Sequence, residues 1–174
     1  MIIRQEKPSD YDEVYRLVKK SFSTVCTGGA EPDEQDYLNE IRGRDTFIPE
    51  LSLVAENDDR AIVGQVVLYK TAITTPCGDL VELLLSPICV HPDYFRRGIA
   101  RAMLCEAFRI AKEMGFRAVF LCGDPEIYGR LGFVPSYRYN IFHKDDESKT
   151  AEWSMVCELY SGALSGVSGT IDTV

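Results

Sequence analysis

The sequence predicts one α/β domain, residues 1–174, with a mixed, mostly antiparallel sheet of about seven strands and four helices. Two observations support this fold class. Short apolar runs rich in Val, Ile and Leu alternate with segments whose apolar residues recur every three or four positions. Glycine, proline, asparagine and aspartate separate these segments, as expected at turns. A hydrophobic content of 45% is enough for a sizeable core.

The stretch 83–114 organises the chain. Its first part is an apolar run that stops at His91-Pro92, which predicts a buried strand. The second part predicts a long amphipathic helix that ends at Gly115. The apolar face of this helix consists of Ala100, Met103, Leu104, Ala107, Phe108 and Ala111.

The remaining elements follow from the same patterns. Strands are expected at 2–3, 51–56, 61–73, 118–122, 133–142 and 153–160, and helices at 8–23, at 33–42 and from Pro125 onward. The Ser86-Pro87 pair predicts a bulge or frayed edge in the central strand, because proline has no N–H to donate. Glycines and small residues after Ser161 predict a loose C-terminal tail over 161–174.

The turn between the central strand and its helix has a chemical use. The first turn of a helix carries N–H groups without helical partners and the positive end of the helix dipole, and both attract anions. Gly98 and Ala100 would let a diphosphate approach the backbone of residues 96–101, and Arg96 and Arg97 add charged donors. An ordinary loop with a solvated basic edge is the alternative interpretation.

Two motifs resemble those of a known family. Val90-His91-Pro92 and Gly98-Ile99-Ala100 resemble motif A of the GNAT superfamily of N-acetyltransferases, although Phe95 stands where that motif has Gln or Arg. The stretch from Tyr128 to Phe133 resembles Tyr-x-x-x-Gly-Phe of motif B. The resemblance runs from about Ile3 to about Gly169 and is nearest to the YhbS-like branch of these enzymes.

The resemblance implies a GNAT fold with a central splay in the sheet and helices on both faces. Acetyl-CoA would be the co-substrate, with its pantetheine arm in the splay. Its binding residues would be Ile88, Cys89, Val90, Phe95, Arg96, Arg97, Gly98, Ile99, Ala100, Arg101 and Tyr128. In this family the early helix-loop-helix generally forms one wall of the acceptor site, so substrate choice is expected there, beside a mobile joint at Gly28-Gly29. A plain connecting loop is the alternative. A homodimer is a further family-level expectation.

Two side chains are candidates for catalysis. Tyr128 matches the motif tyrosine that the family sets beside the CoA sulfur, so it is expected to protonate the leaving thiolate. The alternative is a tyrosine that packs its ring beneath the cofactor. Glu82 would share a strand face with Leu84 and Ser86, and could act as the base for the amine, directly or through water. The alternative is a carboxylate at the solvated start of the strand.

Composition excludes other classes. A net charge of −8 disfavours nucleic acid as a partner, and no apolar run reaches the ~18 residues of a membrane helix. The start of the chain lacks a signal-peptide pattern, so a cytoplasmic protein is expected. Six cysteines without C-x-x-C spacing and two histidines predict no metal site. Cys89 and Cys122 are expected to be small apolar fillers.

The predicted function is therefore direct acetyl transfer from acetyl-CoA to a primary amine. A small polyamine, an aminoglycoside, an amino acid, and a protein lysine or N-terminus all remain open as the acceptor. The rival interpretation is a non-catalytic acyl-CoA-binding or regulatory domain of the same fold, because no motif fixes a base.

Overall fold

The computed structural model describes residues 1–24 and 33–173, which form two compact units. The first unit combines Met1–Tyr69 with Ser86–Ile110, and the second combines Lys70–Leu85 with Ala111–Val174. Within the described residues, no helix is long and apolar enough to cross a membrane. The predicted joint at Gly28-Gly29 lies outside the described residues.

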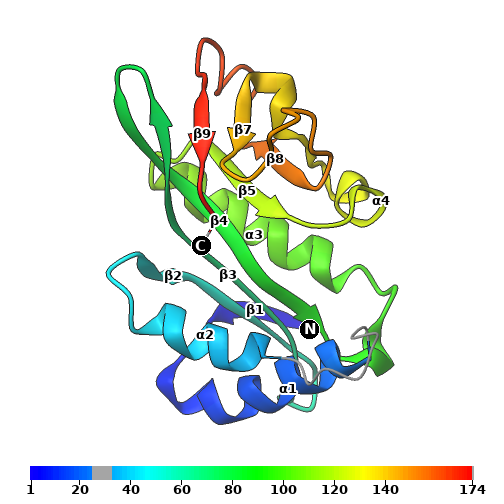
Figure 1. Cartoon of the computed structure of the whole chain (residues 1–174). Coiled ribbons are helices and arrows are strands. Elements are labelled where there is room, and N and C mark those ends of the chain that lie inside the picture. Colours follow the sequence, from blue (N-terminus) through cyan, green and yellow to red (C-terminus); the bar gives the residue numbers. More distant parts are fainter. Residues whose placement is uncertain (25–32, 174) are drawn as a thin grey trace. The chain divides into compact units, whose positions relative to one another are not determined.

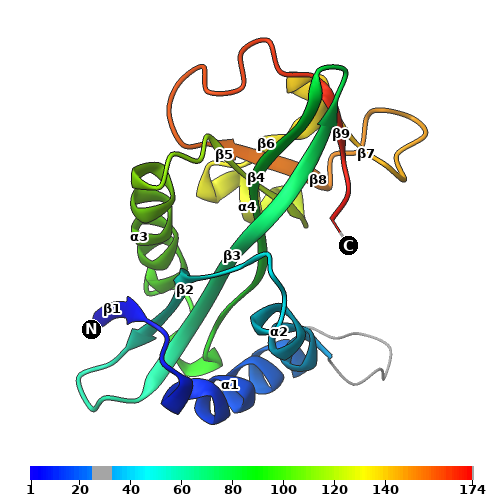
Figure 2. The same cartoon turned by 90° about the vertical axis from the view of Figure 1, so that its left-hand side faces the viewer.

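The first unit is built on antiparallel strands. Strand β1 (Ile2–Gln5) pairs with β2 (Phe47–Glu56), and β2 pairs with the first part of β3 (Ile62–Thr75). Helices α1 (Tyr11–Ser23) and α2 (Glu34–Arg42) lie side by side on one side of these strands, and α3 (Ile99–Glu113) lies on the other (Figures 1 and 2). Both faces of this part of the sheet are therefore covered by helices.

Side-chain periodicity explains how these helices pack. In α1 the residues Val14, Leu17, Val18 and Ser21 are buried at helical spacing. On the other side, α3 approaches β3 closely at Gly64, where a Cβ atom would meet Met103 Cε at 2.9 Å and Ile99 Cγ2 at 3.2 Å. The absence of a side chain at Gly64 thus lets the first turns of α3 rest on the strand.

Charged groups are buried in the first unit as bonded pairs. The Glu6 carboxylate accepts a hydrogen bond from Ser52 Oγ at 2.7 Å and from Arg42 Nη2 at 2.5 Å. Arg4 Nη1 donates to Asp10 Oδ2 at 2.7 Å, and Arg4 Nε donates to Glu56 at 2.8 Å. These contacts tie β1 and the start of α1 to α2 and β2.

The second unit contains parallel and antiparallel strands. The first part of β4 (Gly78–Val90) pairs in parallel with β5 (Ala118–Cys122) at Leu83 and Leu84. Strand β5 pairs antiparallel with β8 (Ser154–Glu158), and β8 with β6 (Val134–Pro135). Strand β9 (Gly169–Ile171) pairs antiparallel with the end of β3 and in parallel with β7 (Ile141–His143). The short helix α4 (Pro125–Tyr128) follows β5.

The predicted fold class is confirmed, with four α-helices in the described residues and mostly antiparallel strand pairs, but two elements differ from the prediction. The strand expected at 133–142 is interrupted by a 3-10 turn at Ser136–Tyr139, which ends at Asn140 with φ 58°. The tail is not loose throughout, because β9 pairs at Gly169, whose missing Cβ lets it lie against the Thr74 backbone. The described residues thus form nine strands instead of seven.

The Arg4–Asp10 pair predicts a loss of stability in acid. Hydrogen bonds from Arg4 lower the pKa of Asp10 below its ordinary 3.8. This stabilisation is complete above the unfolded pKa and is lost as pH falls through the lower folded value. Asp10→Asn should reduce the free energy of unfolding by about 1–3 kcal/mol at pH 7, and the deficit should shrink below pH 4. Urea unfolding from pH 3 to pH 7 measures it, with exposed Asp12→Asn as control; a deficit that does not change with pH contradicts the assignment.

Candidate active site

The turn that joins β4 to α3 has an unusual backbone. His91 caps a short 3-10 turn at Pro92–Tyr94, with its Nδ1 accepting from the Asp93 N–H at 3.2 Å. Arg96 then takes φ 60° and Gly98 takes φ 78°, both in the left-handed region. Only glycine adopts such values without a steric cost, so Arg96 is held in a strained conformation. The chain reverses within a few residues and enters α3 directly.

This reversal exposes the start of α3. The Ala102 N–H donates to the Gly98 carbonyl at 3.0 Å, so the N–H groups of Ile99 and Ala100 precede the helical ladder. Gly98 is solvent-exposed, and no atom lies within 4 Å of the position that its Cβ would occupy. Phe95, Arg96, Arg97 and Arg101 are exposed too. The turn thus offers backbone donors, positive charge and open space together, which are the requirements of a diphosphate.

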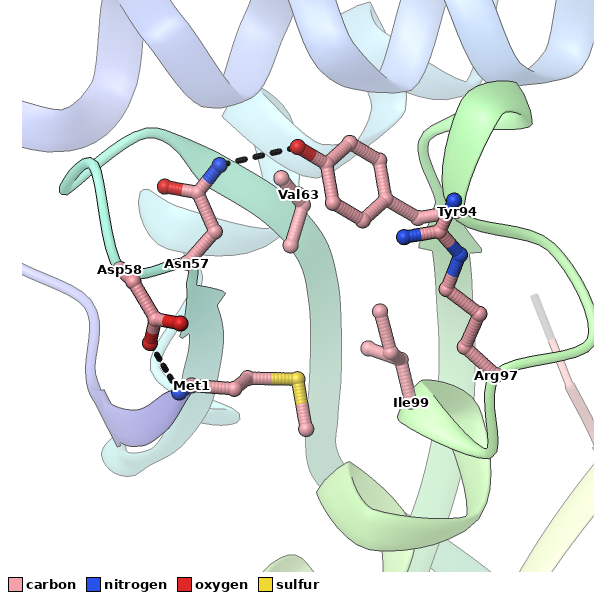
Figure 3. A pocket seen from close by; sticks show the side chains of 7 residues that line it. All are labelled: Met1, Asn57, Asp58, Val63, Tyr94, Arg97 and Ile99. Atoms are coloured by element: carbon pink, nitrogen blue, oxygen red, sulfur yellow. Dashed lines mark hydrogen bonds and ion pairs between the residues drawn. The ribbon is translucent and has the colours of Figure 1, made fainter.

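One of the two arginines of the turn has a second partner. The Arg97 guanidinium lies 4.9 Å from the centre of the Tyr94 ring, a cation–π contact. Figure 3 shows both side chains on one wall of a cavity of about 200 Å³. The Asn57 amide donates to the Tyr94 hydroxyl at 3.0 Å across the same cavity. Tyr94 and Asn57 belong to no motif, so sequence reasoning did not select them.

The end of β4 presents backbone and apolar side chains. Cys89 is buried, as predicted, and burial raises the pKa of its thiol to about 12, so the thiol stays protonated and is a poor nucleophile. Ile88 and Val90 are half-buried. The Val90 carbonyl already accepts from Ser21 Oγ at 3.0 Å. A gap in the sheet at 88–90 would leave backbone groups for the pantetheine arm to bond, but this carbonyl already has a partner.

Glu82 occupies a position in the second unit that differs from the predicted one. Its side chain is 1% exposed and accepts from the Arg117 N–H at 2.8 Å, from Arg117 Nε at 2.8 Å and from the Ala118 N–H at 3.2 Å. Both carboxylate oxygens are engaged at the start of β5. The expected solvated strand start is wrong, and these bonds favour a structural role over that of a base.

Tyr128 is the last residue of α4, and its ring contacts Phe133, a residue of the same motif. Asp124 caps the helix by accepting from the Glu126 N–H at 2.8 Å, as its sequence predicts. The Tyr128 ring meets Phe133 edge-on at 6.0 Å, and it lies so close to Gly123 that no side chain would fit there. Burial raises the pKa of the Tyr128 phenol. A phenol in this environment keeps its proton at neutral pH and can donate it.

The prediction that Cys122 is a small apolar filler is wrong. Cys122 ends β5, but its side chain is exposed and its Sγ lies 3.4 Å from Thr173 Oγ1. It is therefore not an apolar filler. The other four residues of β5 are buried, and only Cys122, at the last position of the strand, is exposed. The apolar run in the sequence did not predict this exposure.

Several solved structures of acetyltransferases are similar to this chain. A crystal structure of the GNAT family N-acetyltransferase YhbS from Escherichia coli in complex with CoA has a TM-score of 0.82 and 27% identity, over 98% of this chain and 88% of that one. A GNAT family acetyltransferase from Brucella melitensis in complex with acetyl-CoA has a TM-score of 0.66 and 26% identity, over 76% of this chain and 81% of that one.

A GNAT family acetyltransferase from Staphylococcus aureus shares the fold alone, with a TM-score of 0.66 and 15% identity over 91% of this chain and 99% of that one. No curated protein sequence matches the chain. The family model described as an acetyltransferase (GNAT) domain matches residues 2–136, which include β4, the turn, α3 and Tyr128. The chain therefore belongs to the GNAT family of acetyltransferases.

Proposed function

We propose that this protein binds acetyl-CoA and transfers its acetyl group directly to a primary amine. The observation that carries the proposal is the left-handed turn at Arg96 and Gly98, which leaves the first N–H groups of α3 accessible beside exposed arginines. Two solved relatives above 25% identity were crystallised with CoA or acetyl-CoA, which supports the same ligand here.

The residues of the turn fit the diphosphate of this ligand. Residues 96–101 would hold it through backbone N–H groups, with Arg96 as a charged donor, and open space at Gly98 permits close approach. Arg97 would contribute only if it left the Tyr94 ring. The bound co-substrate supplies an acetyl thioester, which is the electrophile of the reaction.

In the proposed reaction the amine nitrogen forms a bond with the thioester carbonyl carbon, and the bond from that carbon to sulfur breaks. The amine loses a proton, and the thiolate gains one. Tyr128 is assigned as the proton donor, because it matches the motif tyrosine of the family and its phenol carries a proton at neutral pH. Glu82 is not assigned as the base, since Arg117 and Ala118 occupy its carboxylate.

A matched pair of glycines tests the binding turn. Gly98 has φ 78° and Gly166 has φ 77°, and neither has an atom within 4 Å of its missing Cβ. Replacement by tryptophan should cost each variant about 1–2 kcal/mol of folding stability, because both take the same left-handed backbone. Only Gly98→Trp should lose acetyl-CoA affinity, at least tenfold by calorimetric titration. Equal acetyl-CoA affinities in the two variants would contradict the proposal that the diphosphate binds at this turn.

Tyr128→Phe tests the proton donor. The ring contact with Phe133 is retained and only the hydroxyl is lost, so kcat should fall about 10²–10⁴-fold while acetyl-CoA affinity stays within a few fold. Release of CoA in the presence of an amine panel provides the rate. Binding without turnover in the unmodified protein would instead support the non-catalytic acyl-CoA-binding interpretation.

The Glu82→Gln variant distinguishes a structural role of this carboxylate from a role as the catalytic base. The variant breaks the ion pair with Arg117, which is 31% exposed, so the loss of stability should be about 2–3 kcal/mol, less than for a fully buried pair. At a temperature where the variant is folded, kcat should change less than threefold. A drop of 100-fold or more in a folded variant would restore Glu82 as the base.

A further inference from the structure

Three polar side chains of the first unit meet beside α2. The hydroxyls of Tyr37, from α2, and Tyr69, from β3, lie 2.7 Å apart. Arg44, just after α2, donates through Nη1 to the Tyr37 hydroxyl at 3.5 Å, and its guanidinium lies 5.0 Å from the centre of that ring. We name these residues the Tyr37–Tyr69–Arg44 cluster. No motif of the sequence marked it.

The cluster is dominated by hydrogen-bond donors. A guanidinium has five N–H donors and no acceptor, and it is always charged. The two polar contacts described for the Arg44 side chain are long: 3.5 Å to the Tyr37 hydroxyl, and 3.6 Å to Glu40, whose side chain is 68% exposed. Such a pair at the surface is worth little. Donor capacity and positive charge therefore remain for a group that accepts hydrogen bonds and is negative.

The same face of β3 carries a buried side chain whose polar atoms have no partner in the described part of the chain. Gln65 is 0% exposed, and neither its amide nitrogen nor its amide oxygen has a hydrogen bond there. It precedes Tyr69 by four residues, so both side chains lie on one face of the strand. An unpaired buried polar atom lowers the stability of the fold by about 1–3 kcal/mol, and a polar ligand that bonds to it would offset this cost. This face is thus suited to a polar ligand.

This face also runs beside the end of β4. The His91 N–H donates to the Val63 carbonyl at 2.8 Å, so β3 and β4 are neighbours there. In an antiparallel ladder this bond places Gln65 opposite Cys89. Ser21 of α1 bonds to Val90 from the same side. The polar face therefore borders residues 88–90, where the family resemblance implies the pantetheine arm of the co-substrate.

We propose that the Tyr37–Tyr69–Arg44 cluster selects the acetyl acceptor and binds a carboxylate on it. The acceptor is then an amino acid or a similar small molecule with both a primary amine and a carboxylate. This inference depends on the acetyl transfer proposed above. Polyamines and aminoglycosides are disfavoured, because they bring only positive charge to Arg44.

The test compares acceptors that differ only in the carboxylate. Lysine is paired with cadaverine and with lysinamide, and phenylalanine with phenethylamine and with phenylalaninamide. The carboxylate member of a pair should have a kcat/KM at least tenfold higher, through KM. Arg44→Gln and Tyr37→Phe should each raise KM for that member about tenfold, with kcat within twofold, and should leave the amides and amines unchanged. Arg44→Lys, which keeps the charge, should recover part of the effect.

Exposed Arg16→Gln is the matched control, because it removes one positive charge elsewhere in the first unit. Equal kcat/KM values for carboxylates and amides would overturn the inference and leave acetyl transfer intact, as would an Arg44→Gln variant that slows every acceptor alike. If acetyl-CoA binds but no amine is acetylated, the proposed function fails. In that case calorimetric titration with lysine and lysinamide decides the carboxylate site: preference for lysine that Arg44→Gln abolishes supports it, and no preference overturns it.

Discussion

The start of α3 imposes the strongest constraint on the first unit. A strand can present helix N–H groups to a ligand only if the chain reverses abruptly, and here Arg96 and Gly98 do this with left-handed backbone. A non-glycine residue in that region costs about 1–2 kcal/mol. Packing of Ile99 and Met103 on Gly64 offsets this cost, because it fixes α3 against β3 from its first turn. The geometry of the turn therefore depends on the absence of a side chain at Gly64 in β3.

The three buried carboxylates among the described residues hold elements together. Glu6 bonds to Arg42 and Ser52, Asp10 bonds to Arg4, and Glu82 bonds to Arg117. Each is buried beside a cation that satisfies it, and removal of either partner would leave an uncompensated charge. A buried glutamate near a predicted cleft is therefore weak evidence of a base until its partners are known. This explains why Glu82 was an attractive candidate and why the structure favours another role.

The proposed diphosphate turn and the proposed proton donor rely on different parts of the chain: backbone in one, a side chain in the other. The turn before α3 is proposed to bind through backbone N–H groups, which do not depend on the side chain at Phe95, where the family motif has Gln or Arg. Tyr128 is proposed to act through its hydroxyl, and its ring contacts Phe133 and lies against Gly123, where a side chain would clash with it. Acceptor choice is assigned to α2 and β3, where Tyr37 and Tyr69 meet. The family's reaction and its substrate choice would thus be encoded by different elements.

The sequence alone predicted the family, the fold class, most elements and the glycine turn, because these depend on local patterns: apolar periodicity, turn residues and two motifs. It failed where neighbours distant in sequence decide the outcome. Glu82 is buried because Arg117 and Ala118 bond to it, and the tail is ordered because β9 finds an edge of β3. Tyr37 and Tyr69 are 32 positions apart, so only folding brings their hydroxyls together. Periodicity records which face of an element is buried, but not which partner it meets there.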